Sequence, residues 1–570
     1  MEKWVLAAKR ADFQEIGRKY GIDPVIARII RNRDITEDAE INRYLNGTLD
    51  DIPSWKSLKD IDKAVEIISQ KIDLGTRMRI IGDYDIDGVT ATYILLKGFK
   101  RLGANVDTYI PDRIADGYGI HNHLIEKAKE DGIDTIVTCD NGISAADQIT
   151  FAKKMGMTVV VTDHHEVPFE DTEEGRKYKL PLADAIINPK QSDCTYPNKN
   201  ICGAVVAMKL VFALYEKYGI PESEKEDYLE PAAIATVGDI MDLQGENRIL
   251  VKEGLLRLPH TKNKGLKALI RAIGLENQKI SSYDIGFRLG PCINASGRLD
   301  TAMRSLSLLQ CEDEEEAAKL ANDLKALNDS RKALTEQGTE VAYKLIEGSN
   351  LKNDRVMVVF LPDCHESLAG IIAGRIREKY HKPAFVLTRG EKSVKGSGRS
   401  TENYSMYEEL VKCDSLLLQY GGHPMAAGLS IEEANVEAFR RQLNENCTLT
   451  EEDIIPKIVI DVPMPISYIN EKLIRQLSVL EPFGKGNAKP VFAQKNLRVL
   501  KTGIYGKTQN TVKLQLMDES GTVMDGVYWG EAKEFAEFAR SHGTISVTYY
   551  PKINSYMGRD SLQIVIQNYC

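Results

Sequence analysis

The sequence of 570 residues lacks several features that would place it in a specialised class of proteins. It has no run of about 18 apolar residues, the length that a membrane-spanning helix needs, so we expect no membrane span. Its nine cysteines include no Cys-x-x-Cys pair, which argues against a zinc ribbon, a thioredoxin-like site and a disulfide framework. No continuous apolar stretch precedes Lys9 and Arg10, so we expect no secretory signal and predict a cytoplasmic location.

What is present is the composition of an ordinary globular protein, with 43% apolar and 28% charged residues. The length predicts about three or four domains, at about 150 residues for each. The formal net charge of −9 weighs mildly against a nucleic-acid-binding protein, because such proteins are often basic overall. Residues 456–570 nevertheless carry a net positive charge, so we expect this segment to have a different role from the rest.

Strands and helices alternate between residues 77 and 189, which indicates βαβ units and a mainly parallel sheet. The expected strands are MRII (78–81), a segment near 105–110, TIVTCDNG (135–142), MTVVVT (157–162) and ADAIINP (183–189). Residues 1–75 and 203–345 have mostly helical patterns. The acidic stretch 312–316 suits the first turn of a long helix that runs to about 347, because the helix dipole favours negative charge there. A solvated acidic face is the alternative.

A second, smaller α/β pattern follows, and then a pattern of strands. The second α/β unit is predicted from a strand at 355–360, a helix at 367–380 and a strand at 383–388. Two glycine-rich stretches follow in this unit, KGSGRS (395–400) and GGHPMAAG (421–428), the latter preceding an expected edge strand. Three strands, one helix and two further strands then fit a small OB-type barrel, a fold that commonly binds single strands. These elements are expected at 490–500, 511–517, 522–529, 531–541, 544–550 and 561–567.

Acidic and histidine residues follow three of the strands in the first α/β unit, and these residues are Asp83, Asp85, Asp87, Asp140, Asp163, His164 and His165. Ligands bind outside the carboxyl ends of strands in open α/β sheets, so these side chains are expected at one edge. Carboxylates crowded together repel one another unless cations neutralise them. Oxygen ligands alone suit Mg²⁺ or Ca²⁺, whereas added imidazole shifts the preference toward Mn²⁺, Fe²⁺ or Zn²⁺. This number of ligands fits two metals, an arrangement that serves phosphoester hydrolysis.

Each acidic string also has a plainer interpretation. DYDIDG (83–88) matches the first half of an EF-hand loop, but its twelfth position is Ile94 rather than Glu, and it follows a strand. It could also be an acidic turn in which Gly88 takes a positive φ. Asp163 could be a helix N-cap beside incidental histidines. Asp239, in an apolar helical stretch, needs a partner if it is buried, and a metal or a hydrogen bond at a helix end would each serve.

Several later strings combine glycine with groups that bind phosphate. Asn294, Ser296 and Arg298 surround a glycine, and an Arg fork beside small donors suits a phosphate. Gly396, Gly398 and Arg399 could bring backbone N–H groups and a guanidinium to a second phosphate. The plainer interpretations are a polar loop with an ion pair for the first string, and a tight turn with a surface histidine for Gly421, Gly422 and His423. For His365, too, the sequence leaves both a phosphate-binding role and a plainer interpretation open.

In their order along the chain, these strings resemble the motifs of the DHH phosphoesterase superfamily, and within it those of the RecJ single-strand-specific exonucleases. The matching strings are GDYDIDG, VTCDNGIS, VVTDHHEVP, INPKQ, ICGAVVAMKL, ATVGDIMDL and RLGPCINASGRLD. KGSGRS and GGHPMAAGLS are similar to the signature of the accompanying DHHA1 domain, and EPFGKGNAKPVF (481–492) to the start of an OB domain. Each string is modestly specific, whereas the ordered set over about 500 residues is very specific.

The resemblance implies an α/β protein with a mainly parallel sheet in its DHH domain. A long helix would join this domain to a smaller α/β DHHA1 domain, and an OB-type β-barrel would end the chain. The implied division is an N-terminal helical segment at 1–70, which would brace the catalytic unit, a DHH catalytic domain at 71–310, a connecting helix at 311–348, a DHHA1 domain at 349–452 and an OB-fold nucleic-acid-binding domain at 453–570.

The resemblance also implies an activity, a metal-dependent 5′→3′ exonuclease that acts on single-stranded DNA in recombination and repair and releases 5′-mononucleotides. Two divalent cations, Mn²⁺ preferred or Mg²⁺, would be held by Asp83, Asp85, Asp87, Asp140, His164, His165 and Asp239. Related phosphatases favour Asp85 and Asp87 over Asp83 as direct ligands. The implied substrate-binding residues are Asn294, Ser296, Arg298, His365, Ser397, Arg399, Gly422 and His423.

The implied partners are single-stranded DNA, a helicase that unwinds it and a single-strand-binding protein. Two other functions stay open. One is a DHH phosphodiesterase of short oligonucleotides or cyclic dinucleotides, which would not need the C-terminal barrel. The other is a non-catalytic DNA-binding scaffold, which should have lost several of the candidate metal ligands.

Overall fold

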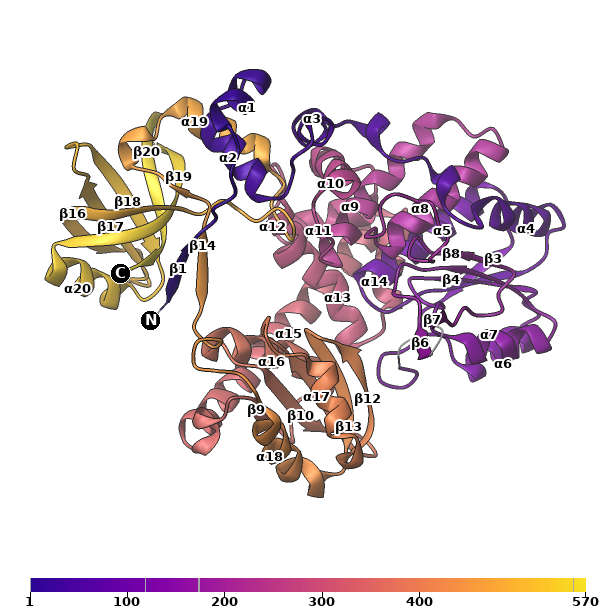
Figure 1. The fold of residues 1–570 in the computed structure, drawn as a ribbon. Helices are drawn as coiled ribbons and strands as arrows, with labels where there is room; N and C mark the ends of the chain where they lie inside the picture. The colour runs from indigo at the N-terminus through magenta and orange to yellow at the C-terminus, as the bar shows by residue number, and fades with distance from the viewer. Residues whose placement is uncertain (1, 118, 173–174, 557) are drawn as a thin grey trace.

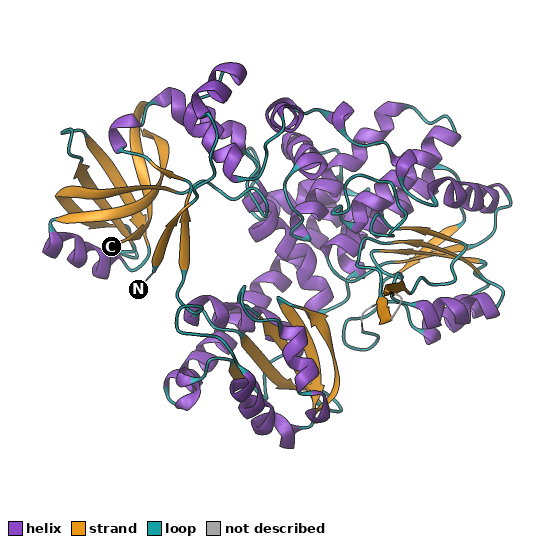
Figure 2. Cartoon of the chain, in the orientation of Figure 1, coloured by secondary structure: helices purple, strands orange, loops and turns teal. Residues whose placement is uncertain are grey.

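The fold, seen in a computed structural model, consists of two α/β units and a barrel, with a layer of helices between them (Figures 1 and 2). The structure describes residues 2–117, 119–172, 175–556 and 558–570. Among these residues no helix is both long enough and apolar enough to cross a membrane.

The first α/β unit is built on a five-stranded sheet with the strand order β3-β2-β4-β5-β8, in which every neighbouring pair is parallel. The strands are β2 (Met78–Ile81), β3 (Val106–Tyr109), β4 (Thr135–Cys139), β5 (Thr158–Thr162) and β8 (Ala185–Ile187). The central strands are buried on both faces, which explains why they are continuous apolar runs. The predicted parallel sheet is therefore confirmed. A separate exposed hairpin, β6 (Phe169–Thr172) with β7 (Gly175–Tyr178), projects beyond the sheet.

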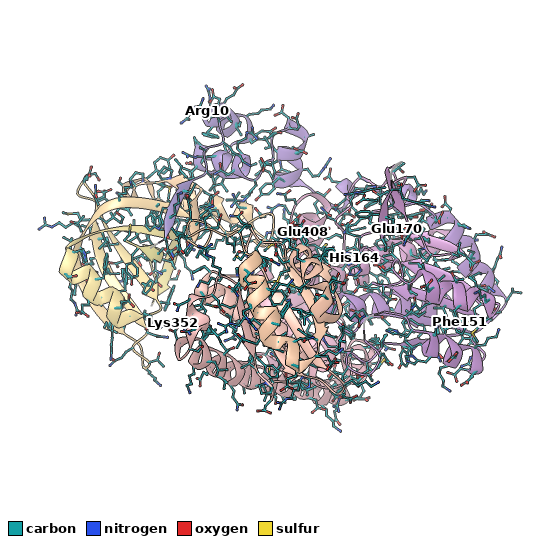
Figure 3. All side chains as sticks on the ribbon, turned by 60° about the horizontal axis from the view of Figure 1, so that its bottom comes forward. Arg10, Phe151, His164, Glu170, Lys352 and Glu408 are labelled. Carbon is teal, nitrogen blue, oxygen red and sulfur yellow. The ribbon has the colours of Figure 1, made fainter. Side chains whose placement is uncertain are left out.

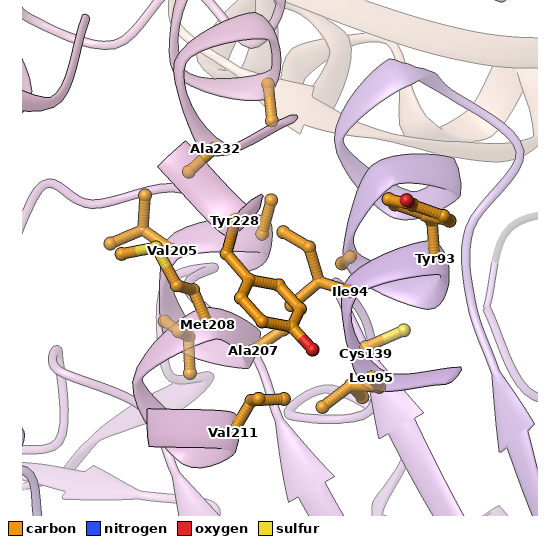
Figure 4. Close-up of a cluster of buried hydrophobic side chains, with 14 of the residues drawn as sticks. Tyr93, Ile94, Leu95, Cys139, Val205, Ala207, Met208, Val211, Tyr228 and Ala232 are labelled. Atoms are coloured by element: carbon orange, nitrogen blue, oxygen red, sulfur yellow. The ribbon is translucent and has the colours of Figure 1, made fainter. Parts of the chain in front are cut away.

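Helices cover both faces of this sheet (Figure 1). One face carries α4 (Ile61–Asp73), α5 (Ile86–Arg101) and α8 (Gly203–Lys217), and the other carries α6 (Asn122–Glu130) and α7 (Ala146–Lys154). The larger core lies on the α5 and α8 side, where Tyr228 packs among apolar side chains of both helices (Figure 4). Gly98 allows this packing, because a Cβ there would lie 2.6 Å from Val211 Cγ2.

A helical layer separates this sheet from the rest of the molecule. Its helices are α9 (Leu229–Gly238), α10 (Gly245–Arg257), α11 (Lys264–Ala272), α12 (Ser282–Asp284), α13 (Gly290–Leu299) and α14 (Met303–Gln310). The long helix α15 (Glu314–Glu347) then leads to the second α/β unit. Asp313 caps it by accepting hydrogen bonds from the amides of Glu315 and Glu316, so the acidic stretch does lie at its first turn.

The second α/β unit has a mixed five-stranded sheet with the order β12-β13-β11-β10-β9. Its elements are β9 (Met357–Phe360), α16 (Glu366–Tyr380), β10 (Ala384–Arg389), β11 (Val394–Arg399), α17 (Met406–Lys412), β12 (Leu417–His423), β13 (Ala426–Ile431) and α18 (Val436–Asn446). The edge strand is β12, which contains Gly421 and Gly422. The prediction of an edge strand after this stretch was therefore wrong, since β13 lies between β12 and β11.

The C-terminal strands close on themselves, with the order β15-β16-β17-β18-β20-β19 and a further pairing of β16 with β19. Their bounds are β15 (Val462–Pro463), β16 (Phe492–Tyr505), β17 (Thr511–Met517), β18 (Val523–Trp529), β19 (Thr544–Tyr556) and β20 (Arg559–Tyr569). Helix α19 (Glu471–Leu477) precedes this barrel, and α20 (Ala532–His542) lies between its third and fourth long strands. The predicted arrangement of three strands, a helix and two strands is confirmed.

The N-terminal segment differs from its prediction in two ways. It begins with a strand, β1 (Lys3–Leu6), which pairs in parallel with β14 (Lys457–Ile460) just before the barrel. The helices that follow are α1 (Phe13–Tyr20), α2 (Pro24–Asn32) and α3 (Asp38–Asn46). Ile26, Ile29 and Ile30 of α2 belong to the same apolar cluster as the barrel core. The segment therefore packs on the barrel as well as on the first α/β unit, a long-range pairing that no local sequence pattern reveals.

Candidate metal centre

The carboxylates after β2 are fixed by the start of α5. Asp85 is the N-cap of this helix and accepts hydrogen bonds from the amides of Asp87 and Gly88, at 2.9 and 3.1 Å. Gly88 is helical rather than left-handed, so the alternative of a turn with positive φ was wrong. Glycine is needed there because a Cβ would lie 2.5 Å from the carbonyl oxygen of Asp83. The turn thus packs Asp83 directly against the first turn of α5.

The next two strands deliver the remaining sheet-edge residues. Asp140 follows β4 in a left-handed conformation, with φ of 60°, an uncommon backbone for a residue other than glycine that points to a special local role. Asp140 lies so close to α8 that a Cβ added to Gly203 would be 2.8 Å from the Cβ of Asp140. After β5, Asp163 accepts hydrogen bonds from the Ile143 amide at 2.9 Å and lies 2.8 Å from His165 Nδ1. Asp163 therefore orients His165, a positioning role that the sequence did not reveal.

Two helices complete the cluster from outside the sheet. The N-terminus of α8 binds the Asp87 carboxylate through the amides of Gly203 and Ala204, at 2.6 and 2.8 Å, where the helix dipole favours an anion. Asp239 is the C-cap residue of α9. The ICGAVVAMKL and ATVGDIMDL strings therefore act at the same point as the acidic turns. Figure 3 labels His164 in the interior, far from the peripheral Arg10 and Phe151.

All seven residues predicted to bind metal lie in one cluster. His164 Nε2 is 3.1 Å from Asp140 Oδ1, and 3.6 Å from both Asp87 Oδ2 and Asp239 Oδ2. Three sets of residues have ligand atoms within 4.8 Å of one another, namely Asp83 with Asp85 and Asp140, Asp87 with His164 and Asp239, and Asp140 with His164 and His165. Because the sets share His164 and Asp140, their geometry fits neighbouring ions rather than isolated ones.

The crowding of acids changes their proton affinity. Burial and the neighbouring Asp85 raise the pKa of Asp83 well above its usual range. Burial and the charge of Asp87 raise the pKa of Asp85 and of Asp140, and bring the pKa of Asp239 to about 8. Carboxylates in this situation keep their protons unless a cation replaces those protons.

The two histidines are in opposite electrostatic states. Burial lowers the pKa of His164, which favours the neutral ring, the form that binds metals. Burial also disfavours the charged form of His165, but the hydrogen bond and charge of Asp163 raise its pKa to about 9. The same contact lowers the pKa of Asp163 to about 2, although burial opposes the shift.

The donor atoms of the cluster fit divalent metal ions. Asp83 Oδ1, Asp239 Oδ2 and His164 Nδ1 are buried and have no hydrogen-bond partner among the residues that the structure describes. Buried polar atoms are almost always satisfied, so several unsatisfied atoms in one place indicate a missing ligand. A set of ligands rich in carboxylate oxygens, with two imidazoles, suits Mn²⁺ or Mg²⁺. It differs from a structural zinc site, in which four ligands enclose the ion.

A group of arginines lies beside this cluster. Arg298 donates to the carbonyl oxygen of Ser367 at 2.8 Å and so connects α13 to α16. Burial and the charges of Arg113 and Arg331 lower the pKa of Arg298 to about 10. Burial and neighbouring arginines also lower the pKa of Arg399. Within the described part of the chain, Arg298, Arg331 and Arg399 form no ion pair, so this positive charge is available to an anion.

Arg113 and Arg331 were not among the predicted residues. Arg113 lies over the ring of Tyr84, 4.5 Å from its centroid, in the loop after β3. Arg331 is on α15, where it donates to Asn328 Oδ1. Only the position of Arg113, shortly after a sheet strand, gave a signal that the sequence reasoning could have used.

Only some of the other predicted substrate-binding residues lie near the arginines. Asn294 and Ser296 face inward, since Asn294 Oδ1 accepts from the Ile86 amide at 2.8 Å and the Ser296 hydroxyl lies 2.8 Å from that of Ser305. RLGPCINASGRLD is helical rather than a polar loop, since it runs from the end of a π-helical turn through α13. His365 is the N-cap of α16, and its Nδ1 lies 2.8 Å from the Ser367 hydroxyl, so it lies at the contact with Arg298.

The glycine-rich stretches are strands rather than phosphate loops. Gly396 and Gly398 lie in β11, where a Cβ would be 2.3 Å from Leu387 and 2.5 Å from Phe385. Their role is close packing, and the expectation of free backbone amides there was wrong because β11 pairs on both sides. Ser397 lies between them and Arg399 follows Gly398, and Arg399 donates to Ser397 Oγ at 3.2 Å. Gly422 and His423 are exposed at the end of the edge strand β12.

Comparisons with known families and proteins agree with this architecture. The model described as the DHH family, N-terminal domain, matches residues 77–236. The DHHA1 domain model matches residues 353–448, and the RecJ OB domain model matches residues 460–568.

Similar curated proteins span nearly the whole chain. The single-stranded-DNA-specific exonuclease RecJ of Escherichia coli is 33% identical over 571 residues, which cover 96% of this chain and 96% of that protein. The protein of the same name from Bacillus subtilis is 34% identical and covers 96% of this chain and 68% of its own length. The crystal structure of RecJ in complex with Mn²⁺ from Thermus thermophilus superposes with a TM-score of 0.83 at 27% identity, covering 100% of this chain and 79% of that one. A second structure from that organism is described as a complex with Mg²⁺.

Proposed function

The chain belongs to the RecJ family of single-stranded-DNA-specific exonucleases, and we propose that it degrades single-stranded DNA from the 5′ end and releases 5′-mononucleotides. The observation that carries this proposal is the cluster of five carboxylates and two histidines at one edge of the first sheet, in which Asp83, Asp239 and His164 have buried polar atoms without a hydrogen-bond partner among the described residues. The role that we propose in the cell is recombination and repair.

The cluster would hold two divalent cations, with Mn²⁺ preferred and Mg²⁺ as the alternative. The proposed ligands are Asp83, Asp85, Asp87, Asp140, His164, His165 and Asp239. Two such ions supply a water of lowered pKa and neutralise charge on the scissile phosphate, which is the chemistry that phosphodiester hydrolysis needs. Two RecJ structures from Thermus thermophilus, described as complexes with Mn²⁺ and with Mg²⁺, support both ions as candidates.

The chain's own residues would bind and orient the substrate. Arg298, Arg399 and Arg113 form no ion pair with a carboxylate among the described residues, so they are suited to hold the terminal phosphate. Ser397, His365 and His423 come from the second α/β unit, which would grip the strand from the opposite side. Asp163 keeps the His165 ring in position through its hydrogen bond.

Specificity for single strands would come from the way that the domains surround the substrate. The barrel has the OB-type arrangement that commonly binds single strands. We propose that it binds DNA downstream of the cleaved end. An enzyme of this kind acts on strands that are already separated, so a helicase and a single-strand-binding protein are the proposed partners.

The test uses two single-stranded oligonucleotides, one labelled at the 5′ end and the other at the 3′ end, incubated with purified protein and Mn²⁺. We expect the 5′ label to leave at once as a mononucleotide while the 3′-labelled strand shortens progressively, and we expect EDTA to stop both. Asp140→Ala should abolish cleavage. Persistent cleavage by that variant would contradict the metal-centre proposal. Turnover of dinucleotides without cleavage of long strands would instead favour the small-substrate alternative.

A further inference from the structure

Three asparagines form hydrogen bonds with the main chain of the turns that carry the proposed metal ligands. Asn141 follows β4, Asn188 follows β8, and Asn294 lies on α13. Asn141 and Asn188 are fully buried, with 0% of their surface exposed. A buried amide side chain needs hydrogen-bond partners, and these side chains have theirs in the metal-binding turns and in the segments beside them.

Asn141 connects two of these turns. Its Nδ2 donates to the carbonyl oxygens of Ile81 and Cys139, at 3.1 and 2.9 Å. Ile81 is the last residue of β2, two residues before Asp83, and Cys139 is the last residue of β4, directly before Asp140. One side chain therefore holds together the two strand ends from which Asp83 and Asp140 emerge.

The main chain around Asn141 is held as well. The Thr138 hydroxyl donates to the carbonyl of Asn141 at 2.9 Å, and the Asp140 amide donates to the carbonyl of Thr162 at 3.0 Å. Gly142 has a φ of 110°, and a Cβ there would lie 2.5 Å from Thr138 Oγ1. The turn is thus fixed on both sides of Asp140, which accounts for its left-handed backbone.

Asn188 holds the turn after β5 from the neighbouring strand. Strand β8 pairs in parallel with β5 up to the last residue of each, so Asn188 lies beside the turn that carries His165. Its Nδ2 donates to the carbonyl of His165 at 3.0 Å, and its Oδ1 accepts from the Lys190 amide at 2.8 Å. Asp163 orients the His165 ring, and Asn188 fixes the main chain of the same residue.

Asn294 acts on the first turn of α5. Its Oδ1 accepts from the Ile86 amide at 2.8 Å, and Ile86 lies between Asp85 and Asp87 in the sequence. The first amides of a helix have no acceptor within the helix. Helix α13 therefore supplies the acceptor that the start of α5 needs, and it does so between two proposed ligands.

Asparagine suits this position next to a crowded acidic cluster. Its amide is neutral, and it can both donate and accept hydrogen bonds. An aspartate or glutamate would add negative charge to the five carboxylates, and a lysine or arginine would compete with the cation for them. The three side chains therefore form a neutral layer that holds the turns without changing the charge of the cluster.

We propose that Asn141, Asn188 and Asn294 are positioning residues that hold the metal-binding turns in their binding geometry before a cation binds. This inference rests on the proposed metal centre and extends it, because it assigns the preorganisation of that centre to the protein rather than to the ions. Hydrogen bonds that orient metal ligands in this way account for about 10–100-fold in metal affinity. The inference therefore predicts weaker metal binding when the asparagines are replaced.

The first test measures Mn²⁺ binding without DNA, by isothermal titration calorimetry. Leucine is close to asparagine in size, so Asn141→Leu and Asn188→Leu remove the hydrogen bonds without opening a cavity. We expect each to raise the dissociation constant for Mn²⁺ about tenfold or more. The matched control is Asn444→Leu on α18, because Asn444 Nδ2 also donates to two carbonyls, those of Val356 and Arg440, at 2.9 and 3.0 Å. This control should bind Mn²⁺ as the wild type does.

The second test separates positioning from a purely structural role. We expect Asn188→Leu to need a higher concentration of Mn²⁺ for half-maximal cleavage, whereas its KM for a single strand at saturating Mn²⁺ should equal that of the wild type. Urea unfolding in EDTA gives the stability of Asn141→Leu, Asn188→Leu and Asn444→Leu. If the first two variants lose stability but bind Mn²⁺ as tightly as the wild type, the asparagines are structural only and the inference is overturned.

The third test uses the wild-type protein, so it does not depend on whether a variant folds. Amide hydrogen exchange is followed by mass spectrometry in EDTA and in Mn²⁺, for peptides that cover residues 82–88, 139–143 and 163–166. We expect these turns to exchange slowly in both conditions, because the asparagines hold them without the ions. Turns that exchange freely in EDTA and become protected only in Mn²⁺ would overturn the inference. A wild type that binds no Mn²⁺ in the calorimeter would instead overturn the proposed metal centre itself, and this inference with it.

Discussion

The first α/β unit contains two groups of mostly buried charged side chains, and they are satisfied in opposite ways. In one, Lys209 lies 2.7 Å from Glu246 Oε1, the hydroxyl of Tyr196 donates to Glu246 at 2.7 Å, and the carbonyl of Pro53 accepts from Lys209 at 3.1 Å. In the other, the candidate metal cluster, like charges face one another, and Asp83, Asp239 and His164 have buried polar atoms that make no hydrogen bond within the described part of the chain. Asp83 and His164 are about as well shielded from water as Lys209 and Glu246, whereas the Asp239 side chain is 25% exposed.

This difference separates structural charge from functional charge. A buried ion is tolerated when an opposite charge and hydrogen bonds replace its water, and the Lys209 pair meets that condition. It connects the N-terminal segment at Pro53 with α8 and α10. The metal cluster meets the condition only when a cation is added. Burial alone therefore does not identify a functional site, whereas burial with unsatisfied donor atoms of one charge does.

The largest expected effect comes from removing one charge from the metal cluster. Asp239→Asn keeps the shape of the side chain and replaces an oxygen that we propose as a metal ligand and that makes no hydrogen bond to the described residues. Metal ions contribute several kcal/mol to such reactions, so we expect the rate of single-strand cleavage to fall by about 10³-fold or more. Steady-state cleavage measures the rate, and urea unfolding in EDTA should show no loss of stability. A variant that is destabilised but still active would mean that Asp239 serves stability rather than catalysis.

The opposite result is expected for the paired cluster. Glu246→Gln leaves the Lys209 ammonium buried without its counter-charge, and breaking a buried pair in this way costs about 3–5 kcal/mol of unfolding free energy. Urea unfolding followed by circular dichroism measures the loss, while the rate per folded molecule should stay unchanged. Adding Lys209→Met should recover part of the stability, because the uncompensated charge is then absent. A loss of activity without a loss of stability would mean that this pair also serves catalysis.

Metal binding should stabilise the protein through one cluster alone. Mn²⁺ at about 100 times its dissociation constant adds about 2.7 kcal/mol for each site that only the folded state offers. Thermal unfolding with Mn²⁺ and with EDTA should therefore differ for the wild type and for Glu246→Gln by the same increment. The increment should shrink in Asp239→Asn. Equal increments in all three proteins would place the metal elsewhere.

The smallest effect is expected at an exposed pair, which sets the baseline for the comparison. Lys59 lies 2.7 Å from Asp193, whose side chain is 64% exposed. Water competes for both charges, so Asp193→Ala should change the unfolding free energy by no more than about 1 kcal/mol and leave cleavage unchanged. Urea unfolding of this variant beside Glu246→Gln would show how much burial adds. A loss as large as that of Glu246→Gln would show that pairing matters more than burial.

The sheet-edge residues of this cluster could be predicted because Asp83, Asp140 and Asp163 follow apolar strands, and parallel strands deliver such residues to one edge. The role of Asp163 could not, because it depends on an amide 20 residues earlier, that of Ile143. Arg331 was hidden for a similar reason, since a polar residue in a long helix has no local signal for what it faces. Ser296 had the right chemistry, but its helix turns it toward Ser305.

The glycines of β11 show that a sequence pattern can also suggest a function that the structure does not support. Gly396 and Gly398 look like a phosphate loop when spacing alone is considered, but their strand needs glycine to fit against Leu387 and Phe385. Packing of this kind depends on residues that lie elsewhere in the sequence. The barrel, in contrast, was predicted element by element because its strands alternate locally and its connections are short.

The contact between the N-terminal segment and the barrel has a consequence for the synthesis of the chain. The Asp23 amide donates to Gln476 across a separation of 453 residues, and a ribosome that adds about 5–20 residues each second needs roughly 20 to 90 s to cover it. During that time β1 has no neighbouring strand, and Ile26, Ile29 and Ile30 of α2 have no barrel to pack against. A chain released before the barrel is made keeps this unpaired strand and bare isoleucine stripe, which are the features that chaperones and proteases capture. Incomplete copies of the protein are therefore expected to be removed rather than to persist as unanchored nucleases.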